Sequence, residues 1–303
     1  MIIPPQLQKS DKIGLISTAR KISLEELTPA IKILKGWGLD VVFGNNLFRE
    51  DNQFSGTIEQ RSSDLQSMID DNSIKTILCV RGGYGTVQII DSIDFSNLVY
   101  NPKWIVGYSD ITVLHSHLNN LGIASLHATM PINFSNNTIG TLNSLKKFLF
   151  ESSSLIDIKP HRFNTIGETT AEIVGGNLSV LYSLIGSKSD INTKGKILFI
   201  EDIDEYLYHI DRMMMNLKRN EKFDKLSGLI VGGMSDMNDN KLSFGKTAEE
   251  IIFEHLKDYN FPICFDFPAG HLDDNNTIVF GVKSWIKISD KKVVLSSSIS
   301  NLS

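Results

Sequence analysis

The sequence is poor in cysteine and has no excess of basic charge. Cys79 and Cys264 are the only two cysteines among 303 residues. Both lie in apolar, strand-like runs without partners at metal-ligand spacing, so we expect buried free thiols rather than a disulfide or a metal site. The net charge is −5, and the lysines are scattered among acids. Binding of nucleic acid needs a basic stripe, so this pattern argues against a nucleic-acid partner and favours a small-molecule or peptide substrate.

Long hydrophobic runs are also lacking. No apolar stretch approaches the roughly 20 residues of a membrane span, and residues 1–6 have neither the charged start nor the apolar core of a secretory signal. We therefore expect a cytoplasmic protein with no membrane partner. With 41% hydrophobic and 21% charged residues, the composition is typical of a globular protein, and the length suggests about two domains.

The first half of the chain alternates strand-like and helix-like patterns. Short apolar runs at residues 12–17, 75–80 and 104–106 predict buried strands, and amphipathic periodicity predicts helices over 24–37 and 57–70. Strands that alternate with helices imply an α/β fold with a parallel sheet covered on both faces. Ligands bind to such sheets at the carboxyl ends of the strands.

The apolar periodicity weakens between about residues 151 and 170, where a run of serines and Pro160 occur. This composition is typical of a linker or crossover rather than of a packed element. We therefore expect three segments: an N-terminal parallel α/β domain over 1–155, a linker over 156–170, and a C-terminal mixed α/β domain over 171–303.

One strand end carries a candidate nucleophile. The run Ile-Val-Gly-Tyr-Ser-Asp-Ile at 105–111 leads an apolar strand into a tight turn and places Ser109 where a helix begins. At such a corner a base can reach the hydroxyl, and free N–H groups of the helix can hold an oxyanion. Alternatively, Ser109 is an ordinary helix cap, because Ile111 replaces the second glycine of a Gly-x-Ser-x-Gly elbow.

Two further reactive side chains follow strand-like runs in the second half. Glu201 comes after the apolar run 197–200, and His271 ends the sequence Phe-Pro-Ala-Gly-His at 267–271. A serine needs an imidazole to take its proton, and the imidazole needs a carboxylate to fix its tautomer. Ser109, Glu201 and His271 are therefore a candidate Ser-Glu-His set, although each residue taken singly is typical of an ordinary strand end or loop.

Two glycine turns are candidate binding elements. The sequence Arg-Gly-Gly-Tyr-Gly at 81–85, with Gly82 and Gly83, could hold an anion or an oxyanion on its N–H groups. A nucleotide-phosphate site would need a third glycine or a Gly-Lys-Ser/Thr sequence, and both are missing. The turn with Gly176 and Asn177 either binds substrate or is a plain strand-to-helix turn. His127 could line the cleft or be a buried histidine.

Several motifs follow one another along nearly the whole chain. They are Gly56-Thr57 with Arg61 and Asp64-Leu65, residues 81–85, Pro102-Lys103, residues 107–112, Gly175-Gly176-Asn177, Ile200-Glu201-Asp202 with Tyr208, Asp211 and Arg212, and residues 267–271. In this order and spacing the chain resembles the LD-carboxypeptidases, or muramoyltetrapeptide carboxypeptidases, and the related microcin-immunity peptidases. One departure from many relatives is Ala128 after His127, where glycine is expected.

The resemblance implies a serine peptidase in which Ser109 is the nucleophile, His271 the general base and then acid, and Glu201 the orienting carboxylate. Backbone N–H groups of Gly83 and Asp110 would form the oxyanion hole. The family further implies a cytoplasmic homodimer, with the serine on the first domain and the other two residues on the second, and no metal or organic cofactor.

The reaction implied by the family is removal of the terminal D-alanine from a murein tetrapeptide through an acyl-enzyme, in cell-wall recycling. One alternative is cleavage of a peptide-nucleotide or acylated antibiotic, as in the immunity peptidases. An alternative from another class is a two-domain protein that binds a phosphate or carboxylate in its glycine turns without chemistry. In any of these, Gly82, Gly176, Asn177 and His127 are the expected substrate-binding residues.

Overall fold

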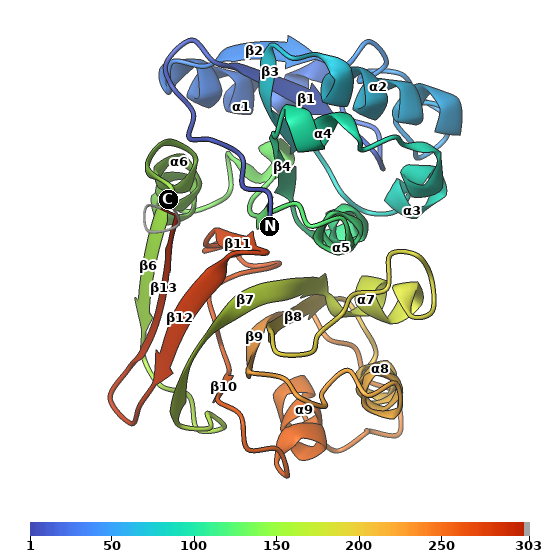
Figure 1. Ribbon diagram of the computed structural model, residues 1–303. Coiled ribbons are helices and arrows are strands. Elements are labelled where there is room, and N and C mark those ends of the chain that lie inside the picture. The colour runs from blue at the N-terminus through green and yellow to red at the C-terminus, as the bar shows by residue number, and fades with distance from the viewer. Residues whose placement is uncertain (300–303) are drawn as a thin grey trace.

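Two β-sheets with their helices form the two halves of the protein (Figure 1), and the computed structural model describes residues 1–299. The first sheet has the order β11-β5-β4-β3-β1-β2, and its strands are parallel except β11, which runs antiparallel to β5. Its strands are β1 (Lys12–Ile16), β2 (Asp40–Phe43), β3 (Ile74–Cys79), β4 (Trp104–Gly107), β5 (Ser125–His127) and β11 (Ile278–Phe280). The expected parallel α/β sheet is confirmed, with one added strand from the second half of the chain.

Helices cover both faces of the first sheet, which explains why its central strands are mainly apolar. In β3, Leu78 packs into the core beneath α1 and α6, whereas its neighbour Ile77 packs into the core beneath α2 and α5. Successive side chains of a strand point to opposite faces, so burial on both faces requires a continuous apolar run. The helices of this half are α1 (Leu24–Gly36), α2 (Ile58–Asp70), α3 (Thr86–Ile89), α4 (Asn97–Tyr100), α5 (Thr112–Asn120) and α6 (Ile139–Glu151).

Capping boxes fix where α1 and α2 begin. Ser23 accepts a hydrogen bond from the backbone of Glu26, whose side chain accepts one in return, and Thr57 and Gln60 form the same reciprocal pair. Each box satisfies N–H groups that have no partner inside the helix. Both helices therefore begin within one residue of the positions expected from the sequence.

The second sheet is mixed, as expected, and has the order β10-β9-β8-β7-β12-β13-β6. Strands β7 to β10 are parallel, and β12, β13 and β6 continue the sheet in antiparallel pairing. The elements of this half are β6 (Ser153–Ile158), β7 (Gly167–Asn177), α7 (Leu178–Leu184), β8 (Ile197–Ile203), α8 (Leu207–Arg219), β9 (Gly228–Ser235), α9 (Ala248–Leu256), β10 (Ile263–Cys264), β12 (Lys283–Ile288) and β13 (Val293–Ser298).

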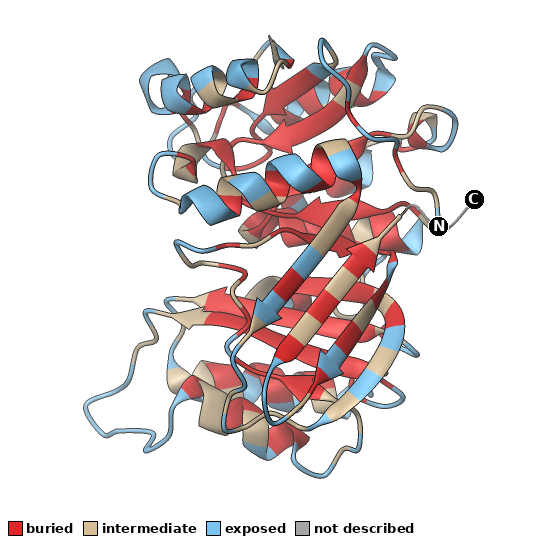
Figure 2. Ribbon diagram, turned by 90° about the vertical axis from the view of Figure 1, so that its left-hand side faces the viewer, coloured by how far each residue is buried: buried red, intermediate tan, exposed pale blue. Residues whose placement is uncertain are grey.

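The antiparallel end of this sheet is buried on one side only. In β13 every second residue is buried, and Figure 2 shows such strands as alternating bands. The segment expected as a linker, 156–170, includes the end of β6 and the start of β7. The sequence concealed β6 because this edge strand, Ser-Ser-Leu-Ile-Asp-Ile, buries little apolar surface. The domain limits remain a prediction.

Two further findings concern the expectations drawn from absences. Cys79 and Cys264 are buried free thiols, as expected, and burial raises the pKa of Cys79 to about 12. Across residues 1–299, no helix combines the length and the apolar character needed to cross a membrane.

Candidate active site

Ser109 occupies a strained backbone position at the corner between β4 and α5. Its φ is 64°, in the left-handed region, which costs a non-glycine residue roughly 1–3 kcal/mol and recurs at functional sites. Ser109 begins a short 3₁₀ turn that ends at Ile111, and its hydroxyl caps no helix. The simple cap interpretation is therefore wrong, because the hydroxyl makes no hydrogen bond within residues 1–299.

Glu201 and His271 form a buried hydrogen-bonded pair. Nδ1 of His271 lies 2.6 Å from Oε2 of Glu201, and the backbone N–H of His271 donates to the same oxygen at 3.3 Å. Burial alone would lower the pKa of His271, but the neighbouring Glu201 carboxylate outweighs it and raises that pKa. With Nδ1 held by the carboxylate, Nε2 of His271 is left to exchange a proton.

Glycine at position 270 makes this pair possible. Gly270 has a φ of 106°, and a Cβ placed there would lie 2.7 Å from Cβ of Glu201. The loop after Gly270 is held by α6, since the backbone N–H of Thr138 donates to the carbonyl of Asp273 and that of Asn275 to Thr141 Oγ1. The histidine thus sits on a loop fastened to the half of the chain that carries the serine.

Ser109 and His271 line one cleft, which has a volume of about 640 Å³. No hydrogen bond joins the serine hydroxyl to the imidazole in this structure. The ring of Tyr108 packs against His271 with centroids 4.8 Å apart. The structure therefore brings the serine and the Glu-His pair to the same cleft. In serine peptidases, the hydrogen bond between the serine hydroxyl and the imidazole commonly forms or shortens only when substrate binds.

The glycine loop of residues 81–85 passes directly beside Ser109. A Cβ on Gly82 would lie 3.3 Å from Ser109 Oγ. The backbone N–H groups of Gly83 and Asp110 donate no hydrogen bond within residues 1–299, as an oxyanion hole requires. The Asp110 carboxylate accepts from the backbone of Thr86 at 2.9 Å, which ties this loop to the turn that carries the serine.

The buried side chain of Arg61 holds the same loop through hydrogen bonds. Its Nη1 donates to the carbonyls of Thr18, at 2.8 Å, and Gly85, at 3.0 Å, and its Nη2 donates to Gln88. Arg61 belongs to the family-like motif in α2, yet it does not line the cleft. We infer that its role is to fix the loop's backbone.

The expected substrate-binding residues are divided between the cleft and the interior. Gly82 and Asn177 line the cleft. Gly176 does not, because it faces Thr112, whose Oγ1 would lie 2.3 Å from a Cβ at that position. His127 is completely buried among Tyr108, His115, Phe199 and Phe280, so the expectation that it lines the cleft is corrected.

The burial of His127 gives a stability prediction. Neither ring nitrogen of His127 has a hydrogen-bond partner within residues 1–299, whereas His115 bonds Ser125 Oγ and the Gly107 carbonyl through its two nitrogens. A buried polar group without a partner costs about 1–3 kcal/mol. We expect His127→Phe to leave the free energy of unfolding unchanged or raise it, and His115→Phe to lower it by about 1–3 kcal/mol. Urea unfolding measures both, and a larger loss for His127→Phe would contradict this account.

Among the cleft residues that the sequence analysis missed as site candidates are Asp202 and Arg20. Asp202 lines the cleft, and burial followed by the charge of Glu201 raises its pKa to about 7. Its carboxylate accepts from Asn177 Nδ2 and from the backbone of Ser179, both at 2.8 Å. Arg20 also lines the cleft. Its one signal in the sequence is its position after β1, at the sheet edge where Ser109 lies.

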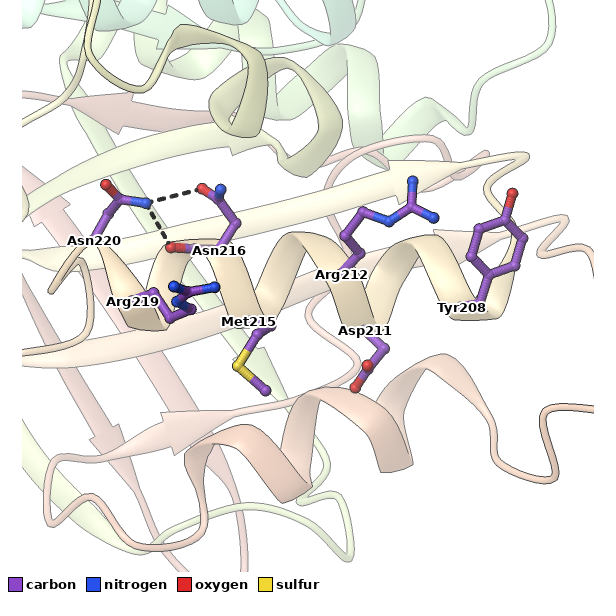
Figure 3. A pocket seen from close by; sticks show the side chains of 7 residues that line it. All are labelled: Tyr208, Asp211, Arg212, Met215, Asn216, Arg219 and Asn220. Atoms are coloured by element: carbon purple, nitrogen blue, oxygen red, sulfur yellow. Dashed lines mark hydrogen bonds between the residues drawn. The ribbon is translucent and has the colours of Figure 1, made fainter.

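A second hollow lies on the outer side of α8 and has a volume of about 680 Å³. Figure 3 shows its lining side chains, which come from α8 and from Asn220 directly after it. They include Tyr208, Asp211 and Arg212 of the family-like motif, and the Arg212 guanidinium packs on the Tyr208 ring at 5.1 Å. This hollow contains neither Ser109 nor the Glu-His pair, so the cleft is the candidate active site.

Comparison with known proteins identifies the family. The N-terminal domain of the LD-carboxypeptidases matches residues 13–128, and their C-terminal domain matches residues 170–286. A probable murein peptide carboxypeptidase of Bacillus subtilis is 32% identical, over 98% of this chain and 95% of that protein. The chain belongs to the LD-carboxypeptidase family. It is therefore a serine carboxypeptidase, and the binding protein without chemistry is set aside.

Other LD-carboxypeptidase relatives agree in sequence and fold. The microcin C7 self-immunity protein MccF of Escherichia coli is 24% identical, over 96% of this chain and 95% of that protein. The crystal structure of muramoyltetrapeptide carboxypeptidase from Oxalobacter formigenes superposes with a TM-score of 0.87 at 24% identity, covering 95% of this chain and 98% of that one. The two-domain α/β fold of the family is thus shown for this chain.

Proposed function

We propose that this LD-carboxypeptidase removes the C-terminal D-alanine from murein tetrapeptides through an acyl-enzyme on Ser109. The observation that carries the proposal is the 2.6 Å bond between His271 and Glu201 at the cleft that Ser109 lines. The name of the Bacillus subtilis relative supports a murein peptide as substrate.

In the first half-reaction, Nε2 of His271 accepts the hydroxyl proton of Ser109 as Oγ attacks the carbonyl carbon of the scissile bond. The negative charge that develops on the carbonyl oxygen is stabilised by the N–H groups of Gly83 and Asp110. Glu201 stabilises the imidazolium and keeps its tautomer. His271 then protonates the leaving amine, and D-alanine departs.

In the second half-reaction, water takes the place of the amine. His271 removes a proton from the water as its oxygen attacks the ester of Ser109, and returns that proton to Oγ when the ester bond breaks. The shortened peptide leaves with a new carboxylate. The chain's own residues supply every proton transfer in this sequence.

The direct test is incubation of the purified protein with a murein tetrapeptide and detection of D-alanine by mass spectrometry. Release of one D-alanine per peptide, leaving the tripeptide, is the expected result. A protein that is folded but leaves the tetrapeptide intact would refute the proposed substrate.

The microcin-immunity activity is the second candidate, and it is favoured by the resemblance to MccF over nearly the whole chain. Competition separates the two substrates. We expect a murein tetrapeptide to be cleaved with a higher kcat/KM than a peptidyl nucleotide when both are present. The reverse preference would assign the chain to the immunity peptidases.

Cytoplasmic location and a homodimer belong to the same proposal, and both are supported by the family resemblance. Light scattering of the purified chain tests the dimer. A molecular mass near that of one 33.8 kDa chain would refute it.

The Glu-His pair predicts the direction of the pH dependence. A general base works only when neutral, and Glu201 raises the pKa of His271. We therefore expect kcat/KM to rise with pH through an inflection above the ordinary histidine value of about 6.5. Measurement from about pH 5 to 9 locates the inflection, and Glu201→Gln is expected to shift it to lower pH. An inflection unmoved by that substitution would contradict the assignment of His271 as base.

A further inference from the structure

One positive charge in the cleft is left unused by the proposed reaction. Arg20 lines the cleft together with Ser109 and Gly83. Its guanidinium makes no ion pair, hydrogen bond or ring contact with any residue in 1–299. An arginine without a partner at the reaction centre has five N–H donors available to a ligand, in a planar arrangement that matches a carboxylate.

The backbone of Arg20 is fixed to the glycine loop of residues 81–85. Its N–H donates to the carbonyl of Gly82 at 3.4 Å, and its own carbonyl accepts from Ser17 Oγ at 2.6 Å. The side chain then runs over Gly83, where a Cβ would lie 2.6 Å from Cδ and 2.7 Å from Nε of Arg20. With a φ of 110°, Gly83 both adopts the turn and leaves room for the arginine.

Recognition of a free chain end requires a carboxylate-binding group at this place, and a cation is well suited to that role. Three bonds separate the scissile carbonyl carbon from the carboxylate carbon of the terminal residue, so these atoms are no more than about 4 Å apart. A group that recognises the terminal carboxylate must therefore lie next to the oxyanion hole. Arg20, in contact with Gly83, meets that requirement.

Other charged groups of the cleft do not compete for this role. Arg81 is already engaged, since its Nη1 donates to the carbonyl of Lys21 at 3.1 Å and lies 3.6 Å from Glu26 Oε1. Asp204 and Glu205 line the cleft from the second sheet, and their negative charge disfavours a carboxylate on that side. The charges thus direct the anionic end of a peptide toward Arg20.

We propose that Arg20 binds the C-terminal carboxylate of the substrate and so restricts the enzyme to removal of the last residue. The inference rests on the proposed function and adds to it the group that recognises a free chain end. A bidentate pair between the guanidinium and the carboxylate would place the scissile carbonyl at the Gly83 and Asp110 N–H groups.

The test compares two substrates that differ only at the chain end: a murein tetrapeptide with a free carboxylate and the same peptide with a C-terminal carboxamide. We expect the wild type to prefer the free acid by about 10- to 100-fold in kcat/KM. Arg20→Gln should lose that preference through a higher KM for the acid, with the carboxamide rate unchanged, and Arg20→Lys should restore part of it. Lys21→Gln removes a neighbouring exposed charge and serves as the matched control, with the preference intact.

Each outcome is decisive. If Arg20→Gln slows both substrates equally, its role is structural and the inference is overturned. If the wild type cleaves the acid and the carboxamide equally, the inference about Arg20 is also overturned. The proposed hydrolysis would still stand in that case. If the wild type cleaves neither peptide, the proposed function fails and the inference fails with it.

Discussion

Replacement of Ser109 by alanine is expected to lower the rate of D-alanine release by at least about four orders of magnitude, because no other group then forms the acyl-enzyme. Alanine keeps the Cβ and the backbone environment of the corner, so the fold should persist. Intact-mass analysis adds a second readout. Wild-type protein quenched during turnover should carry the mass of the peptidyl group, and the variant should not.

Ser116 provides the matched control for this substitution. It lies on α5, seven residues after Ser109, and its buried hydroxyl has no hydrogen-bond partner among the described residues 1–299. Ser116→Ala therefore removes a serine hydroxyl from the helix that follows Ser109 without touching the cleft, and the rate should stay within a few-fold of wild type. A Ser109→Ala protein that is as active as this control would end the account of Ser109 as nucleophile.

Glu201→Gln is expected to lower kcat by about four orders of magnitude. The carboxamide is nearly the same size as the carboxylate, but its NH₂ can donate to Nδ1 of His271. The imidazole would then carry its proton on Nε2, where it can no longer accept the proton of Ser109. Removal of the negative charge also withdraws the stabilisation of the imidazolium.

Steady-state kinetics at a pH where the wild type is fully active measures this loss, and circular dichroism verifies the fold. Glu172→Gln is the matched control. Glu172 lies in β7 of the same sheet, 3.7 Å from Lys196, and does not line the cleft. Rates that fall equally in both variants would show that the sheet, and not the Glu-His pair, was disturbed.

Sequence patterns were informative wherever local chemistry determines the structure. β1, β3 and β4 are mainly apolar because most of their residues are buried, and α1 and α2 have capping boxes at their N-termini. The strands β12 and β13 were missed for the opposite reason. They have water on one face, so polar side chains interrupt their apolar pattern, and β6 is an edge strand with little burial.

The residues of the candidate site also divide into those that the sequence predicted and those that it did not. Ser109 follows β4, Glu201 lies near the carboxyl end of β8, and His271 lies in the loop after β10. The carboxyl ends of these strands could be located in the sequence, so the approach of the three residues to one cleft could be expected. The burial of His127 and the position of the Arg20 side chain over Gly83 depend on contacts between segments far apart in the chain. His127, for example, packs against Phe199 with ring centroids 4.9 Å apart. No local pattern in the sequence encodes such a contact.

The strand β11 links the two halves in a way that limits how the enzyme can be divided. It begins seven residues after His271 and completes the first sheet by pairing with β5. A fragment that ended before β11 would expose an unpaired edge of β5, open to aggregation. The two halves of the chain therefore cannot be exchanged independently of each other. Recombination between relatives at residues 156–170 would join β5 of one protein to β11 of another. These two strands pair with each other, so they would have to be exchanged together.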